Sequence, residues 1–398
     1  MPIFHLLKNK DFRLFITASS INELAFMARL TAIGWLSYEI SDSPLFVGIV
    51  ATSSGISMSL LSVFGGVLAD KISKPKLIFV SKFGESIILL LTGILIQFDQ
   101  LTQISLIILM FFNGIMAALY IPSRMGFIKE LVGQKLLLSA NAVDFGFMTL
   151  VGSFTPALAG LMIEKISIEF TLYLAFIAYS IHNILILSLR NKGMIYKSKQ
   201  ELNIFQSYKF ILRLNIVKYL LITMLSVAVL VWGLETLSPV IAKDIFNLGP
   251  MGFGVLLSIG SLGATIASFS IASFNNININ KLLAFSLIGI GITLIVFSFT
   301  ENYLTGMLLF GVLFAFGASS ENAITTLVQN SVPDGMRGKV ISLQTVTWGF
   351  SALSGLVGGY LSEIYSIQLV ILIFGILILL ISPISKPIAT NSKRMKIM

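Results

Sequence analysis

The sequence predicts an all-α polytopic membrane protein with twelve transmembrane helices in two pseudo-symmetric six-helix bundles. Its composition is the first indication, because 56% of the 398 residues are hydrophobic, 11% are charged and the mean hydropathy is +0.93. Such values lie outside the range of soluble domains. The second indication is a series of long apolar runs, and the third is a set of short motifs that recur about half a chain later.

The apolar runs fall into two groups of six separated by a polar stretch. A helix of roughly 20 residues spans a bilayer core about 30 Å thick. In lipid only helices and closed β-barrels satisfy the hydrogen bonds of the backbone, and the long continuous apolar runs here indicate helices. The predicted helices of the first group lie near residues 14–38, 45–69, 77–97, 104–123, 139–163 and 168–189. Those of the second group lie near residues 219–242, 252–274, 282–299, 303–325, 339–362 and 367–384.

The same pattern predicts the domain organisation. Residues 1–190 form an N-terminal bundle, residues 191–217 form a cytosolic linker, and residues 218–398 form a C-terminal bundle with a short basic tail. No small-residue cleavage site follows the first apolar run, so we expect the first helix to be retained.

The positive charges predict the orientation. With a cytosolic N-terminus, 23 of the 27 Lys and Arg residues fall in inward loops and termini, whereas the outward loops hold Lys165 and Lys243. Cytoplasmic loops carry such an excess of cations, so both termini are predicted to be cytosolic. The net charge of +9 is thereby explained by loops facing anionic headgroups, which argues against a nucleic-acid partner.

Two weak internal repeats suggest a parallel duplication, which is typical of many secondary transporters. Both repeats consist of small residues and prolines at four-residue spacing, and the first ends on an acid. The first repeat relates Gly152, Pro156, Gly160 and Glu164 to Ser351, Gly355, Gly359 and Glu363, 199 residues later. The second relates Pro44 and Gly48 to Pro250 and Gly254, 206 residues later.

The loop after the second helix carries the strongest motif. The stretch Gly66-Val-Leu-Ala-Asp-Lys-Ile-Ser-Lys-Pro-Lys76 resembles the signature loop between helices 2 and 3 of the major facilitator superfamily, except that Ser73 stands where the family usually has Gly. The resemblance implies a conformational gate that holds the two halves together; the alternative is a plain positively charged inward loop. The gate residues implied here are Gly66, Asp70, Lys71, Lys74 and Lys76, joined by Asp144 and Arg337 at cytosolic helix ends.

Other stretches resemble the branch of that superfamily that contains enterobactin exporters and macrolide-efflux proteins. They include Pro122-Ser-Arg124, Ala140-Asn-Ala142, Pro239-Val-Ile-Ala242 and Arg337-Gly-Lys-Val340. In the fifth helix, Pro156 and Gly160 resemble a Gly-Pro-x-x-Gly-Gly element associated with exporters, although Thr155 and Ala159 replace two of its glycines. Simple helix packing explains these small residues equally well. The export-type or packing element comprises Gly152, Pro156, Gly160, Gly355 and Gly359.

Ionisable residues within the predicted helices are the candidates for function, because each is costly in the bilayer. Glu23 and Arg29 lie in the first helix on different faces, whereas Asn22 and Arg29 share a face. Since burial favours the neutral form of an acid, Glu23 is the candidate for proton coupling; the alternative is a hydrogen-bonded structural acid. The 206-residue offset maps Arg29 onto Glu235, so we expect an ion pair between them or, alternatively, separate solvation. Asn113 is a further candidate to line the cavity.

Two other sets of polar residues are expected to be structural. Lys82 and Glu85 are three apart and are predicted to pair on one helix face, with Lys82 extending toward the cytosol. His182 is expected to be a hydrogen-bonded core residue rather than a proton relay.

Taken with the resemblance, these features predict a secondary active transporter that exports a small amphiphilic molecule, such as a siderophore, macrolide or other drug, by alternating access and proton antiport. An importer or uniporter, or a non-transporting receptor, is the alternative. The chain has no Cys and two His, which argues against an enzyme, a metal site or a cofactor. We expect a monomeric multi-pass protein of a bacterial plasma (inner) membrane.

Overall fold

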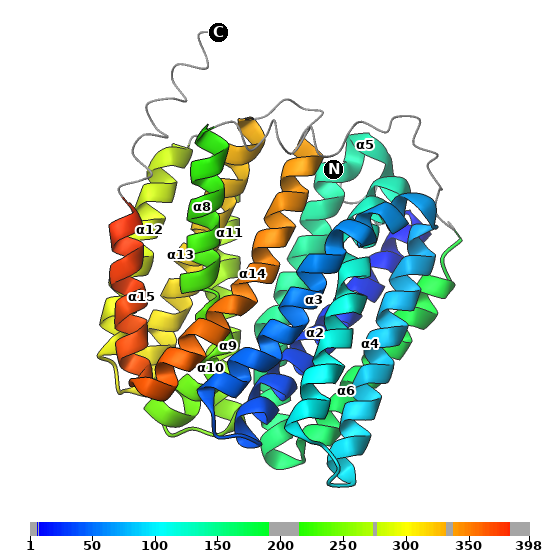
Figure 1. Cartoon of the computed structure of the whole chain (residues 1–398). Coiled ribbons are helices and arrows are strands. Elements are labelled where there is room, and N and C mark those ends of the chain that lie inside the picture. Colours follow the sequence, from blue (N-terminus) through cyan, green and yellow to red (C-terminus); the bar gives the residue numbers. More distant parts are fainter. Residues whose placement is uncertain (1–5, 7, 191–214, 274–276, 332–336, 383–398) are drawn as a thin grey trace. The chain divides into compact units, whose positions relative to one another are not determined.

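The computed structural model describes residues 6, 8–190, 215–273, 277–331 and 337–382 (Figure 1). Within these ranges the regular elements are helices and there is no strand. The chain divides into two compact units. Unit 1 comprises residues 1–42, 49–199 and 248–258, and unit 2 comprises residues 43–48, 200–247 and 259–398.

The helices correspond to the twelve predicted segments. The first half contains α2 (Lys10–Glu39), α3 (Pro44–Lys71), α4 (Lys74–Gln97), α5 (Gln103–Lys165) and α6 (Ile168–Leu187). The second half contains α8 (Asn215–Leu230), α9 (Gly233–Thr236), α10 (Ser238–Val240), a π-helical turn η1 (Ile241–Ile245), α11 (Pro250–Ser273), α12 (Ile279–Ser298), α13 (Tyr303–Asn330), α14 (Arg337–Ile364) and α15 (Ile367–Ile381).

Nine helical segments of the described residues are long and apolar enough to span a membrane, and Ile367–Ile381 is a shorter apolar helix. The predicted all-α polytopic membrane fold is therefore confirmed.

Short polar side chains set the starts of several helices. A side-chain oxygen just before the first turn accepts hydrogen bonds from backbone N–H groups that have no partner inside the helix. The residues that do so are Asn9 before α2, Thr102 before α5, Ser167 before α6, Asn278 before α12, Asn302 before α13 and Ser366 before α15.

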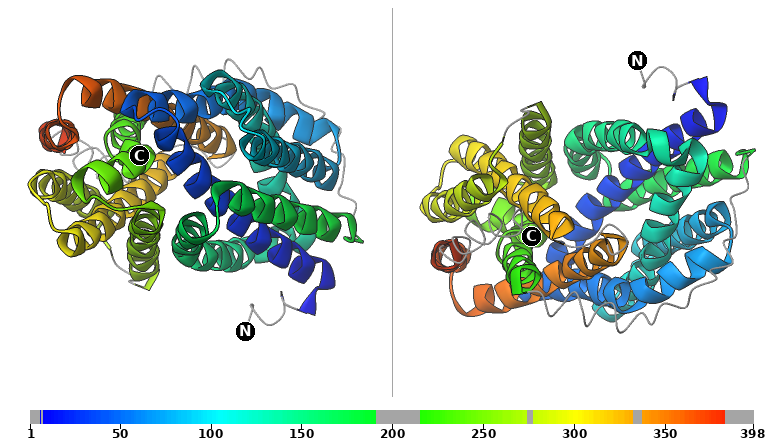
Figure 2. Two further views of the ribbon diagram at one scale, coloured as in Figure 1. Left: turned by 90° about the horizontal axis from the view of Figure 1, so that it is seen from below. Right: turned by 90° about the horizontal axis from the view of Figure 1, so that it is seen from above.

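The two units use equivalent helix pairings. In unit 1, α2 and α4 each pack on α5 and on α6. In unit 2, α8 packs on α14 and α15, while α12 packs on α13 and α15 (Figures 1 and 2). The two parts of α5 correspond to α13 and α14 of the second half. The pairings therefore match between the two units, as expected for a duplicated helical unit.

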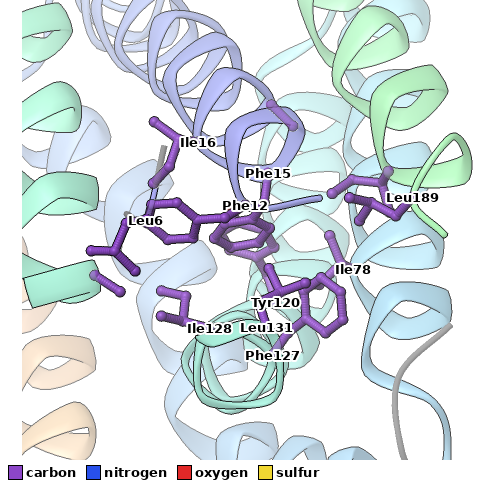
Figure 3. Close-up of a cluster of buried hydrophobic side chains, with 13 residues drawn as sticks. Leu6, Phe12, Phe15, Ile16, Ile78, Tyr120, Phe127, Ile128, Leu131 and Leu189 are labelled. Carbon is purple, nitrogen blue, oxygen red and sulfur yellow. The ribbon is translucent and has the colours of Figure 1, made fainter. Parts of the chain in front are cut away.

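The segment after the fourth predicted helix is helical, so the predicted loop at residues 124–138 is wrong. Helical geometry continues through it, and the break in α5 is at Gly133, whose φ of 72° suits glycine. The spacing of Phe127, Ile128 and Leu131 gives this segment an apolar face. These side chains pack against Phe12 and the rest of a buried cluster at the start of α2 (Figure 3).

The seventh predicted helix, at residues 219–242, is not continuous. Helix α8 ends at Leu230, and the chain then passes through α9, α10 and η1. Pro239 lies in the first turn of α10, where its missing N–H is tolerated. Backbone hydrogen bonds from Glu235 N to Trp232 O and from Leu237 N to Gly233 O continue through this stretch, which contains Glu235.

Candidate substrate and coupling site

A buried ion pair lies in the middle of α4. Lys82 Nζ is 2.8 Å from Glu85 Oε1, and the two residues are 3% and 1% exposed. The ammonium group also lies over the ring of Tyr120, 3.9 Å from its centroid, and 5.1 Å from that of Tyr179. The predicted pair is confirmed. The predicted extension of Lys82 toward the cytosol is wrong, because the aromatic rings of α5 and α6 enclose its charged end.

A second ion pair joins the two parts of α5. Arg124 bonds Asp144 through Nη2, and the same nitrogen donates to Ser19 Oγ of α2 at 3.1 Å. Asp144 is 3% exposed. Sequence reasoning placed Asp144 at a gate but missed Arg124 as its partner, since twenty residues separate them. The close return of the chain after Gly133 brings them together.

Glu23 lies beside these two pairs without forming an ion pair of its own among the described residues. It is 7% exposed, and the charges of Arg124, Lys82 and Asp144 act on it. Its Oε1 lies 3.7 Å from where a Cβ on Gly152 would stand. Gly152 of the export-type element therefore leaves room directly beside the carboxyl of Glu23.

Arg29 and the two candidate asparagines are buried and incompletely bonded. Arg29 is 9% exposed and its guanidinium lies 5.0 Å from the centroid of the Phe26 ring. Arg29 Nε, Asn22 Oδ1 and both amide atoms of Asn113 are buried without a hydrogen-bond partner in the part of the chain that the structure describes. These three residues all belong to unit 1.

Glu235 lies in unit 2, in the interrupted stretch after α8. Its side chain is partly buried, and its backbone carbonyl accepts a hydrogen bond from Ser238 Oγ. Because Arg29 and Glu235 belong to different units, the predicted ion pair between them stays a prediction.

His182 is a buried core residue of α6. Its Nδ1 lies 2.8 Å from the carbonyl oxygen of Ala18, so this nitrogen is the donor. Its ring packs on Tyr120 at 6.3 Å between centroids. The contacts agree with the expected structural role.

The signature loop between α3 and α4 forms one buried ion pair. Lys74 Nζ is 2.5 Å from Glu130 Oε1 of α5, a partner that the sequence does not reveal because its pattern predicts a loop at residues 124–138. Lys71 and Lys76 are exposed. Asp70 is the penultimate residue of α3 and Arg337 is the first residue of α14, and their side chains lie outside the described ones.

The two glycines of this loop differ. A Cβ on Gly65 would clash with the carbonyl oxygen of Ala118 on α5, whereas a Cβ on Gly66 would meet nothing within 4 Å. Close helix approach therefore depends on Gly65 and not on Gly66.

The repeat residues of α5 pack on the first turns of α11 within unit 1. A Cβ on Gly160 would clash with the carbonyl oxygen of Pro250, and one on Gly254 would clash with that of Pro156. The backbone N–H of Ala157 donates to Ser258 Oγ at 3.0 Å, and that of Met251 donates to Glu164 Oε2 at 3.2 Å.

The equivalent contacts occur in unit 2 between α14 and the first turns of α3. A Cβ on Gly48 would clash with the carbonyl oxygen of Gly355, and one on Gly359 with that of Pro44. Glu363 accepts hydrogen bonds from the N–H of Leu45 and from Ser43 Oγ. In both units, a motif of the Gly160 or Gly359 type thus packs on a motif of the Pro250 or Pro44 type that comes from the other half of the chain. The Glu at the end of the first motif accepts a hydrogen bond from the start of the facing helix. This is the close packing that small residues permit between membrane helices.

The helical fold and the apolar spans define a multi-pass membrane protein. The family model described as transmembrane secretion effector matches residues 3–393, and the chain belongs to this family of the major facilitator superfamily.

The relatives that match most of the chain are also transporters by name. The chain is 24% identical over 353 residues to the staphyloferrin A transporter of Staphylococcus aureus, covering 86% of this chain and 87% of the relative. It is 23% identical over 353 residues to the enterobactin exporter EntS of Salmonella paratyphi A, covering 84% and 83%. It is also 23% identical over 422 residues to the uncharacterized MFS-type transporter YfiS of Bacillus subtilis, covering 98% and 96%. These relatives are transporters, not enzymes.

Solved structures share the fold. The D323A mutant of the nucleoside transporter NupG superposes with a TM-score of 0.79 at 14% identity, covering 95% of this chain and 100% of that one. A bacterial homolog of the human lysosomal transporter Spinster superposes with a TM-score of 0.75 at 12% identity, covering 96% of both chains.

Proposed function

We propose that this chain exports a small amphiphilic molecule of siderophore type by alternating access, driven by proton antiport. Its relatives include a staphyloferrin A transporter and an enterobactin exporter, which supports a siderophore in preference to a macrolide or another drug. The protein would act as a monomer in a bacterial inner membrane, with both termini in the cytosol, as the positive-inside distribution favours.

The observation that carries the coupling mechanism is the state of Glu23. Among the described side chains of unit 1, Glu23 is a buried acid without an ion-pair partner, whereas Glu85, Asp144 and Glu130 each bond a cation. A carboxyl group in such a place exchanges a proton more readily than one held by a salt bridge. Gly152 leaves space beside it for water or solute to approach.

The gate is proposed to use the signature loop. Lys74 ties the start of α4 to α5 through Glu130, and Asp144 ties the two parts of α5 through Arg124. Gly66, Asp70, Lys71, Lys76 and Arg337 complete the proposed gate. Rearrangement of these contacts would accompany the change of access.

The test measures proton release from everted membrane vesicles with an acidic interior. A catecholate siderophore that carries a free carboxylate group, a macrolide and a lipophilic cation are added in turn to vesicles containing the wild type, Glu23→Gln or Glu301→Gln. Glu301 is an exposed acid, so its variant is the matched control. We expect release with the siderophore that is lost in Glu23→Gln and retained in Glu301→Gln. Silence of folded, inserted wild-type protein with all three compounds would contradict proton-coupled export.

A further inference from the structure

Arg29, Lys82 and Arg124 are buried cations of unit 1, and Arg29 is the one whose guanidinium forms no ion pair with a described residue. Lys82 bonds Glu85 and Arg124 bonds Asp144, but no ion pair of Arg29 exists among the described residues. Its surroundings are the ring of Phe26, the phenol of Tyr179 and the like charge of Lys82. The guanidinium therefore lies next to another cation and against aromatic surface.

Phe26, Tyr179 and Lys82 leave the charge of Arg29 without a described counter-ion. A cation in the middle of a membrane helix is costly, and it is retained where it pairs, lines a water-filled cavity or meets a charged solute. Here the nearby Lys82 adds repulsion, and Nε of Arg29 is buried without a hydrogen bond. An anion placed against Arg29 would satisfy the nitrogen and offset the repulsion at once.

Unused amide groups provide further bonds in the same unit. Asn22 lies two turns before Arg29 on the same face of α2, about 10 Å along the axis, and its Oδ1 is unpartnered. Asn113 is 1% exposed and neither of its amide atoms has a partner within the described ranges. Buried polar atoms normally find partners, so these unpartnered amide atoms are available to the polar groups of a ligand.

We propose that Arg29 binds a carboxylate group of the transported solute, with Asn22 and Asn113 available to bond its neutral polar groups. The planar guanidinium fork matches a carboxylate in two-point geometry. One unpaired cation balances a single negative charge, which favours a carboxylate over a doubly charged phosphate. Phe26 and Tyr179 offer aromatic surface to the apolar part of an amphiphile. The inference rests on the proposed transport function and assigns the charge class of its solute.

The experiment uses three probes with one apolar body: 4-phenylbutyrate, its neutral amide and 4-phenylbutylamine. Their binding to the purified full chain is measured from the ligand-dependent rise in thermal unfolding temperature, since a ligand of the native state stabilises it by mass action. The variants are Arg29→Gln, Arg29→Lys and the control Arg190→Gln. Arg190 is exposed and lies outside the buried group.

We expect the wild type and Arg190→Gln to bind the carboxylate at least about tenfold more tightly than the amide, and Arg29→Gln to lose that preference. Arg29→Lys keeps the charge without the planar fork, so it should retain part of the preference. If Arg29→Gln does not fold, the ratio of carboxylate to amide binding is compared between the wild type and Arg29→Lys instead. Equal binding of the carboxylate and amide by the wild type, or an undiminished preference in the folded variants, would overturn the proposal.

The outcomes separate this inference from the proposed function. Carboxylate binding that depends on Arg29, without Glu23-dependent proton release, would retain the anion site and contradict proton-coupled export. Proton release on addition of neutral or cationic compounds, with no carboxylate preference, would retain export and contradict the anion site.

Discussion

Removing one member of the Lys82–Glu85 pair should destabilise the protein far more than removing both. The pair is 2.8 Å long and its side chains are 4% and 1% exposed. Replacing Lys82 by Met leaves a carboxylate buried without its cation, which costs about 3–5 kcal/mol. Replacing both residues by Met exchanges the pair for apolar side chains of similar size, a change that is often neutral.

The two single variants should not be equal. In Glu85→Met, the ammonium of Lys82 remains between the rings of Tyr120 and Tyr179, and a desolvated cation–π contact is worth about 2 kcal/mol. We therefore expect Glu85→Met to fall at the lower end of the range and Lys82→Met at the upper end.

A double-mutant cycle measures both effects through denaturant unfolding of the purified protein, followed by tryptophan fluorescence. The expected coupling energy between the two positions is about 3 kcal/mol or more. Additive destabilisation, with the double variant as unstable as the sum of the singles, would refute the view that the cost comes from a stranded charge. Equal loss in both single variants would refute the role given to the two tyrosines.

Two further predictions concern helix contacts. Gly160→Leu should lower the free energy of unfolding by about 1–3 kcal/mol, because the leucine side chain would meet the backbone of Pro250. Gly66→Leu should be nearly neutral, because a Cβ there meets nothing within 4 Å. Thermal unfolding compares the two variants, and equal losses of stability would contradict this interpretation. Glu164→Gln should weaken the contact with the N–H of Met251 by about 0.3–1 kcal/mol, seen as faster hydrogen exchange at the start of α11, and unchanged exchange there would argue against the capping role.

The fold class was accessible from the sequence because lipid imposes one rule on every segment. A run of about 20 apolar residues must be a helix, so the positions of most helices followed from composition alone. The two deviations have local causes. Polar residues hid the apolar face of Phe127, Ile128 and Leu131, and the apolar run from 219 to 242 concealed the interruption after Leu230.

Only part of the candidate site could be predicted from the sequence. Asn22, Glu23 and Arg29 stand out in an apolar helix, and Lys82 and Glu85 pair within one helix, so these were recognised from type and spacing. Arg124 with Asp144, and Lys74 with Glu130, join residues far apart in the chain, and no periodic pattern predicts such partners.

The repeat motifs show where sequence information ends. The four-residue spacing of small residues indicated close packing but not the facing helix. The structure shows that the motif around Gly160 packs on the motif around Pro250, while the motif around Gly359 packs on that around Pro44. The sequence by itself therefore determined the membrane class, the helices and the charges that need partners. Tertiary structure decided which of the described charges are paired, because pairing depends on distances across helices that the order of residues does not encode.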